Sequence, residues 1–182
     1  MVNALEHLHA RGVVFKDLKA ENIVISASGI AKLTDFGLAV SEDQPPEFKS
    51  RPTTPHISAP ECLLHFEFTA ASDWWAFGCL LYEMSVGKPA FSGISQFQIR
   101  KAILERDPCF PAGFDPDLQN LITRLLDKDH SSRVQTAAEV KNHPFFLGTP
   151  FENLEAPCKP HLHSDADTFY FEQKDLSPFP SL

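Results

Sequence analysis

Residues 15–22 read FKDLKAEN, and residues 35–37 read DFG. Two short runs rich in β-branched residues, Val13-Val14-Phe15 and Ile23-Val24-Ile25, flank the charged part of the first motif. Runs of this kind predict short strands, and the Ser28-Gly29 pair that follows predicts a turn. The sequence therefore places a charged loop between two strands, with the DFG tripeptide after the turn.

On the N-terminal side of this stretch, an amphipathic helix is expected. Leu5 and Leu8 recur at helical spacing, and Gly12 is a helix stop signal. On the C-terminal side, residues 41–60 are rich in Pro, Ser, Thr and charge and show neither helical nor strand periodicity. This segment is predicted to be a long exposed loop, and loops of this length are usually functional.

The middle of the chain is predicted to be mostly helical. The segment Trp74 to Ser85 is apolar on all sides, which predicts a fully buried helix that ends at Gly87. Ser72 or Asp73 is the expected cap at its N-terminus. Three further amphipathic helices are expected, at 96–105, 116–126 and 136–142.

Composition limits the classes of function. With 182 residues, 43% of them hydrophobic, the chain can bury one substantial core. A net charge of −8 argues against nucleic-acid binding and favours basic partners. No apolar run reaches membrane-spanning length, and we expect an intracellular monomer in the cytoplasm, with the nucleus as an alternative. The cysteines form no CxxC pair and are expected to be reduced thiols: Cys62, Cys79, Cys109 and Cys158.

The two motifs carry the residue types that phosphoryl transfer needs. That reaction needs a carboxylate to orient and deprotonate the attacking hydroxyl, oxygen ligands for magnesium, and a cation near the migrating phosphate. In their order and spacing the motifs resemble the catalytic loop and DFG turn of protein kinases. The resemblance implies Asp17 as the base, Lys19 as the cation that also contacts ATP, and Asn22 and Asp35 as ligands of Mg²⁺. A Lys two residues after the base is typical of serine/threonine kinases.

Further matches follow in the order that the family has them. Ala59-Pro60-Glu61 resembles the APE motif, and Asp73-Trp74-Trp75 resembles the start of the buried kinase helix. Arg133 is then expected to form a buried ion pair with Glu61, in which either residue is structural. By the same resemblance, Asp73 is expected to hold the backbone of the loop 15–22.

Features near the C-terminus resemble the AGC group of kinases. Besides the paired tryptophans, these are HPFF at 143–146, PCKP at 157–160 and DTFYFE at 167–172. In that group the last segment crosses toward the adenine pocket, which implies that Phe171 contacts the nucleotide. The expected fold is α+β and mainly helical: a kinase-like C-terminal lobe at 1–146, with short antiparallel strands, and an AGC-type tail at 147–182.

The resemblance also assigns residues to substrate binding and control. Glu21 and Glu83 are expected to bind basic residues before the phosphoacceptor of protein substrates, although both also fit solvated surface acids. Thr54 and Pro55 match the substrate-binding segment, where the Thr hydroxyl can bridge Asp17 and Lys19. Ser50 lies near the position of the activating phosphosite, which implies an upstream kinase, with Lys16 as the phosphate's partner.

The 182 residues contain no GxGxxG segment and no strand lysine for the nucleotide phosphates. Without that half of the cleft, water would screen the electrostatic interactions that catalysis requires, so we expect negligible phosphoryl transfer by this chain alone. Two interpretations stay open: part of an active kinase, or a non-catalytic remnant lobe that serves as a protein-interaction module. The intact motif residues favour the first.

Overall fold

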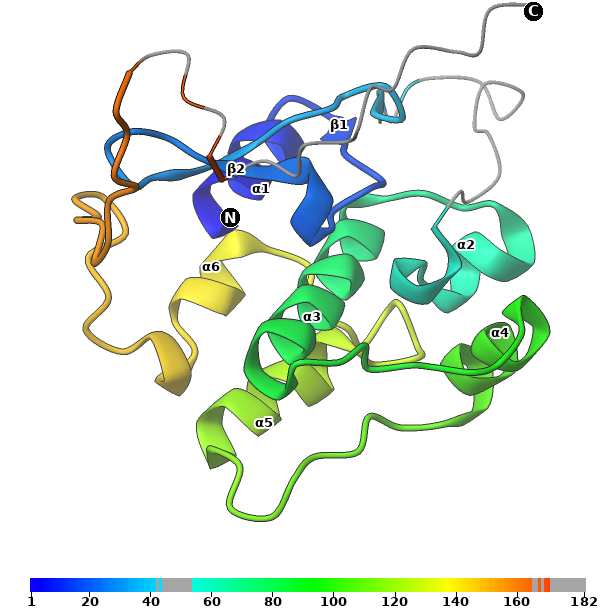
Figure 1. The fold of residues 1–182 in the computed structure, drawn as a ribbon. Helices are drawn as coiled ribbons and strands as arrows, with labels where there is room; N and C mark the ends of the chain where they lie inside the picture. Colours follow the sequence, from blue (N-terminus) through cyan, green and yellow to red (C-terminus); the bar gives the residue numbers. More distant parts are fainter. Residues whose placement is uncertain (42, 44–53, 165–166, 168, 171–182) are drawn as a thin grey trace, which may run out of the picture.

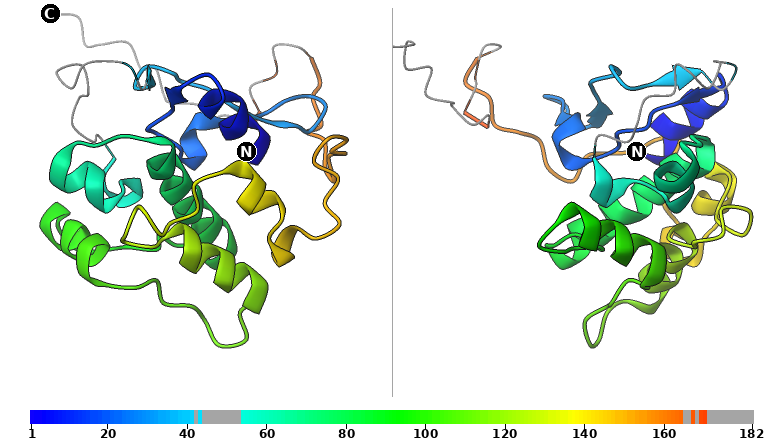
Figure 2. Two further views of the ribbon diagram at one scale, coloured as in Figure 1. Left: turned by 180° about the vertical axis from the view of Figure 1, so that it is seen from behind. Right: turned by 90° about the vertical axis from the view of Figure 1, so that its right-hand side faces the viewer.

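The structure is a computed structural model that describes residues 1–41, 43, 54–164, 167 and 169–170. A long helix runs through its middle, with α1 and the strands on one side and the remaining helices around the other (Figures 1 and 2). The elements are α1 Val2–His9, β1 Val13–Val14, η1 Ala20–Asn22, β2 Ile23–Ile25, β3 Ala31–Leu33, β4 Val40–Ser41, η3 Pro55–Ile57, α2 Pro60–His65, α3 Ala70–Val86, α4 Gln96–Glu105, α5 Pro116–Leu125, α6 Ala137–Lys141 and η4 Pro144–Phe146.

Two small antiparallel sheets hold the loop 15–22. β1 pairs with β4, with Val14 opposite Val40. β2 and β3 form a hairpin in which Ile23 lies opposite Leu33. The loop therefore leaves one sheet and enters the other, so both of its ends are held by backbone hydrogen bonds.

The central helix α3 begins earlier than the sequence prediction placed it. Its N-cap is Thr69, and Ser72 stands at the third helical position, where the two side chains complete a capping box. The prediction of Ser72 or Asp73 as the N-cap is therefore wrong. Ser72 takes part in the capping box, but as a residue of the first helical turn. The prediction that Trp74 to Ser85 are buried is correct as far as Tyr82, but Glu83 is half-buried and Met84 and Ser85 are exposed, because the last turn of α3 extends beyond the core. Gly87 ends the helix in the left-handed conformation.

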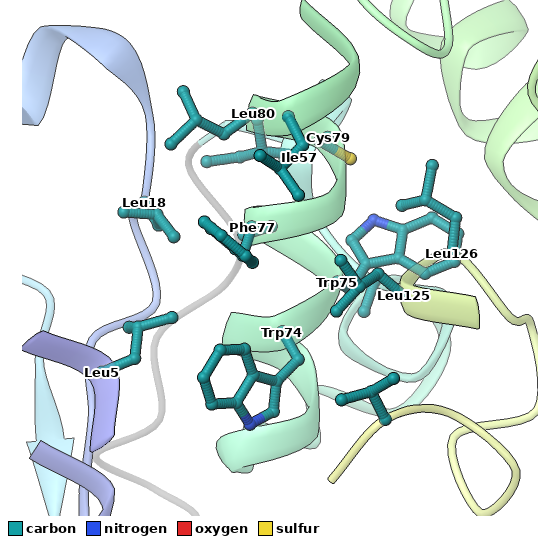
Figure 3. Close-up of a cluster of buried hydrophobic side chains, with 14 of the residues drawn as sticks. Leu5, Leu18, Ile57, Trp74, Trp75, Phe77, Cys79, Leu80, Leu125 and Leu126 are labelled. Atoms are coloured by element: carbon teal, nitrogen blue, oxygen red, sulfur yellow. The ribbon is translucent and has the colours of Figure 1, made fainter. Parts of the chain in front are cut away.

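The core forms around α3. Trp74 and Phe77 face the Leu5 and Leu18 side, whereas Trp75 lies toward Leu125 and Leu126 of α5 and its C-terminal end (Figure 3). Gly78 lets α5 approach α3 closely, since a Cβ there would lie 2.8 Å from the Cβ of Leu125. A side chain at position 78 would force the two helices apart.

The segment after η4 returns to the β2–β3 hairpin, where it runs beside β2 (Figure 1, orange). The Asn3 amide donates to the Phe151 carbonyl at 2.7 Å, which ties the start of this segment to α1. At Gly29, which has φ of 82°, a Cβ would lie 2.3 Å from the Cys158 carbonyl oxygen. Glycine is therefore needed at this turn both for the backbone conformation and for the close contact.

Lys128 is a cation placed in an aromatic environment. Its Nζ lies 4.2 Å from the ring centroid of Phe91 and 4.9 Å from that of Trp75, and the two rings are stacked. The Nζ is buried and finds no hydrogen-bond partner among the described residues. Burial lowers the pKa of Lys128 from 10.5 to about 8.

We expect Lys128→Met to raise the free energy of unfolding at pH 7 by about 1–2 kcal/mol, because it removes a poorly solvated ammonium. The folded pKa is lower than the unfolded one, so the unfolded chain holds the extra proton between pH 8 and 10.5. Stability of the parent should therefore rise with pH across that window, and the variant should lack this rise. Urea unfolding at pH 7 and pH 10 measures both, with exposed Lys88→Met as the control; a less stable variant at pH 7 would contradict the prediction.

Candidate active site

The loop 15–22 is anchored by one carboxylate from the central helix. Asp73 lies in the first turn of α3 and is fully buried. Its two oxygens accept hydrogen bonds from the backbone N–H groups of Phe15 and Lys16, at 2.8 and 2.9 Å. The N-terminus of α3 also favours a negative charge at this position. Asp73 thus holds the backbone that leads into Asp17.

His9 also contacts Asp73, although no motif of the sequence points to it. Its Nε2 lies 2.8 Å from Oδ2 of Asp73, and its ring packs edge-on against Trp74. One feature of the sequence does indicate this contact. His9 is a polar residue four positions after Leu5, and it therefore lies on the buried face of the N-terminal helix. A polar side chain on such a face usually has a buried partner.

Asp17 is the centre of the site. It is 5% exposed, and its carboxylate accepts hydrogen bonds from three side chains: Lys19 at 2.7 Å, Thr54 at 2.8 Å and Asn22 at 2.9 Å. Burial acts to raise the pKa of Asp17, but the hydrogen bonds from Lys19, Thr54 and Asn22 outweigh it and hold the pKa below its usual value. The carboxylate is therefore ionised at neutral pH and fixed in orientation.

Thr54 joins a distant segment to the loop. Besides donating to Asp17, its hydroxyl accepts a hydrogen bond from Nζ of Lys19 at 3.4 Å. The hydroxyl therefore bridges the Asp17 carboxylate and the Lys19 ammonium, as the resemblance implied. Pro55 follows at the first position of η3, where its fixed φ suits the start of the turn.

The hairpin brings Asn22 and Asp35 next to each other in the backbone. The Thr34 N–H donates to the Asn22 carbonyl at 2.9 Å, so the hydrogen bonding of β2 and β3 continues to the residue before Asp35. Asp35 has φ of 59°, a conformation that few residues other than glycine adopt. Lys16 shares this feature, with φ of 71°. Two of the three described non-glycine residues with positive φ thus adjoin the candidate site, and the third, Phe66, caps α2.

The side chains of Asn22 and Asp35 suit a hard cation. The Asn22 amide nitrogen donates to the carbonyl and to the carboxylate of Asp17, both at 2.9 Å, so its oxygen is the atom left to act as a ligand. Asp35 is exposed and its Oδ1 accepts from the Gly37 N–H at 3.1 Å. An amide and a carboxylate oxygen are ligands that Mg²⁺ accepts. Among the described residues, no group of three His, Cys, Asp or Glu side chains is placed to hold a metal.

Glu61 and Arg133 form the expected buried pair. The guanidinium donates to both carboxylate oxygens, at 2.6 and 3.0 Å, and Arg133 is 1% exposed. Arg133 also donates to the carbonyls of Ala71 and Asp127. The pair therefore fixes α2, the start of α3 and the segment after α5 to one another.

Comparison with known proteins agrees with this arrangement. The model of the protein kinase domain matches residues 1–146. The chain belongs to the protein kinase domain family.

Relatives of this kinase domain include protein kinase C-like and RAC kinases, which confirms the resemblance to the AGC group. Protein kinase C-like 1 of Saccharomyces cerevisiae is 36% identical over 98% of this chain and 16% of its own length. The RAC family homolog of Dictyostelium discoideum is 35% identical over 100% of this chain and 43% of its own length. Human RAC-beta serine/threonine-protein kinase is 35% identical over 96% of this chain and 38% of its own length. The chain thus spans less than half the length of these curated relatives.

The two glutamates expected to select substrates lie in different parts of the kinase domain. Glu21 is exposed in η1, immediately before Asn22. Glu83 is half-buried near the end of α3, ten residues after Asp73, which corresponds to roughly 15 Å along the helix axis. The structure therefore places Glu21 on the loop that carries Asp17 and Glu83 on the central helix.

Three expectations concern the control of the kinase domain and the nucleotide. Ser50 and Phe171 lie outside the described residues. Lys16, the expected partner of a phosphate on Ser50, has its Nζ 4.0 Å from the ring centroid of Phe68.

None of the helices in the described part of the chain combines the length and apolar character that crossing a bilayer requires.

Proposed function

We propose that this chain is the C-terminal lobe of a serine/threonine protein kinase, which transfers the γ-phosphate of ATP to a serine or threonine hydroxyl of a protein. The observation that carries the proposal is the environment of Asp17, whose carboxylate is ionised, buried and oriented by Lys19, Thr54 and Asn22. A carboxylate held in this way can orient an attacking hydroxyl.

Each residue of the cluster has a role in this proposal. The substrate hydroxyl donates to Asp17 and passes its proton there as its oxygen bonds to the γ-phosphorus and the bond to ADP breaks. Lys19 offsets negative charge on the migrating phosphoryl group. Asn22 and Asp35 would hold Mg²⁺, which when bound neutralises phosphate charge.

The proposal extends to substrate choice and control. Glu21, with Glu83, favours substrates that have arginine before the phosphoacceptor, because a carboxylate binds a guanidinium through two hydrogen bonds. A phosphate placed on Ser50 by an upstream kinase would have Lys16 as its expected partner. The preference for basic substrates is consistent with the net charge of −8.

The test compares the 182-residue chain with a fusion in which the preceding half of the kinase domain of human RAC-beta kinase is joined before Met1. Each is incubated with Mg²⁺, labelled ATP and a serine peptide that has arginines before the acceptor. We expect the fusion to transfer phosphate at least about 100-fold faster than the chain alone, because the cleft is then closed to water.

Replacing the peptide arginines with glutamine should raise KM for the fusion. A fusion that folds and binds ATP but transfers no phosphate would overturn the proposal and would favour the interaction module instead. Equal KM values for the two peptides would contradict only the role of Glu21 and Glu83 in substrate choice, and not the proposed phosphoryl transfer.

A further inference from the structure

Two of the most exposed apolar side chains of the described residues lie together at the start of α4. Ile94 is 96% exposed and Phe97 is 75% exposed. Helix α4 lies at the edge of the molecule, where it packs against α2 and against η3, the turn that follows Thr54 (Figures 1 and 2). Exposed apolar side chains that adjoin one another indicate an interaction surface more strongly than scattered ones do.

The loop that presents Ile94 is braced against the helix. The Ile94 N–H donates to Oε1 of Gln98 at 3.0 Å, and the Gln98 N–H donates to the Ser95 hydroxyl at 3.3 Å. Gly93 packs tightly on the same residue, since a Cβ there would lie 2.6 Å from Cβ of Gln98. The backbone at Ile94 is therefore held in place before any partner binds, which lowers the entropy lost on binding.

A cavity of about 320 Å³ adjoins Phe97, and it is lined by Ser92, Phe97, Gln98, Lys101 and Arg106. Residues 92–106 carry three cations and one carboxylate, whereas the whole chain has a net charge of −8. The Lys101 ammonium lies 3.8 Å from the Glu105 carboxylate, and both side chains are more than half exposed. An exposed pair at this distance is weak, so Lys101 is available to another anion.

We propose that the patch formed by Ile94, Phe97, Lys101 and Arg106 docks a peptide segment of a partner protein in which an apolar side chain is flanked by acidic residues. The apolar side chain would pack on Phe97 and Ile94, and the carboxylates would pair with Lys101 and Arg106. This binding requires neither ATP nor the Asp17 cluster, so it stands apart from the proposed phosphoryl transfer.

The test uses the 182-residue chain and short synthetic peptides that have one central leucine or phenylalanine flanked by zero to four aspartates, with lysine counterparts. Fluorescence polarisation should show affinity that rises with the number of aspartates and falls with added salt. Phe97→Ser should weaken binding by about tenfold or more. Lys101→Glu/Arg106→Glu should reverse the preference toward the lysine peptides.

Leu147→Ser and Lys88→Glu are matched controls, because each changes an exposed side chain of the same kind outside the patch. Melting temperatures should stay within a few degrees of the parent for all variants. The proposal is overturned by equal binding to the parent and to Phe97→Ser, or by equal affinity for acidic and basic peptides. Two other results would also overturn it, because each identifies a different occupant of the patch. One is displacement of the acidic peptide by an oligonucleotide, and the other is self-association in sedimentation velocity that is lost in Phe97→Ser.

Discussion

Changing Asp17 to asparagine is expected to lower kcat of the fused kinase by about two to four orders of magnitude. Asparagine has nearly the same shape, so the loop should keep its fold, but an amide cannot accept the proton of the substrate hydroxyl. Asp17 also receives three side-chain donors, and the amide NH₂ group would meet one or more of them. KM for the peptide should change little, because Asp17 acts on the hydroxyl and not on the basic residues.

Steady-state kinetics of the fusion measures both constants. Asp117→Asn is the matched control, because this carboxylate is exposed in the first turn of α5, and kcat should then stay within about twofold of the parent. If Asp17→Asn keeps kcat within tenfold of the parent, the assignment of Asp17 as the base is wrong.

Local patterns predicted much of the fold because they depend on residues close in sequence. The helix Gln96–Glu105 and the strand Ile23–Ile25 have the predicted bounds. Helix α5 ends one residue early, at Leu125, and Thr136 caps α6 instead of joining it. Helix α2 begins at Pro60, the last residue of the predicted loop, and the sequence did not predict it. Its six residues are too few to show a helical periodicity.

Contacts between distant segments were predictable only through the family resemblance. Glu61 and Arg133 are 72 positions apart in the sequence. Asp73 is 57–58 positions from the loop residues that it binds. No local pattern encodes contacts over such separations. Lys128 shows the limit most clearly. It stands between Asp127 and Asp129, a context that favours a solvated side chain, yet Trp75 and Phe91 enclose its Nζ.

Arg133→Met is expected to lower the free energy of unfolding by about 3–5 kcal/mol. The variant leaves the Glu61 carboxylate buried without its cation, and the carbonyls of Ala71 and Asp127 lose donors as well. Urea unfolding at pH 7 measures the loss. Arg124→Met is the matched control, because Arg124 also faces a glutamate, Glu139, but at 3.9 Å and half-exposed, so its loss should stay within about 0.5 kcal/mol.

The double variant Glu61→Met/Arg133→Met separates the pair from the rest of the site. If the loss comes from a desolvated, unpaired carboxylate, removing that carboxylate as well should restore part of the stability, and the two single losses should not add. If the double variant instead loses the sum of the single losses, the two residues act independently. Glu61 and Arg133 would then stabilise the domain mainly through packing and the backbone carbonyls, and the ion pair between α2 and the segment after α5 would contribute little.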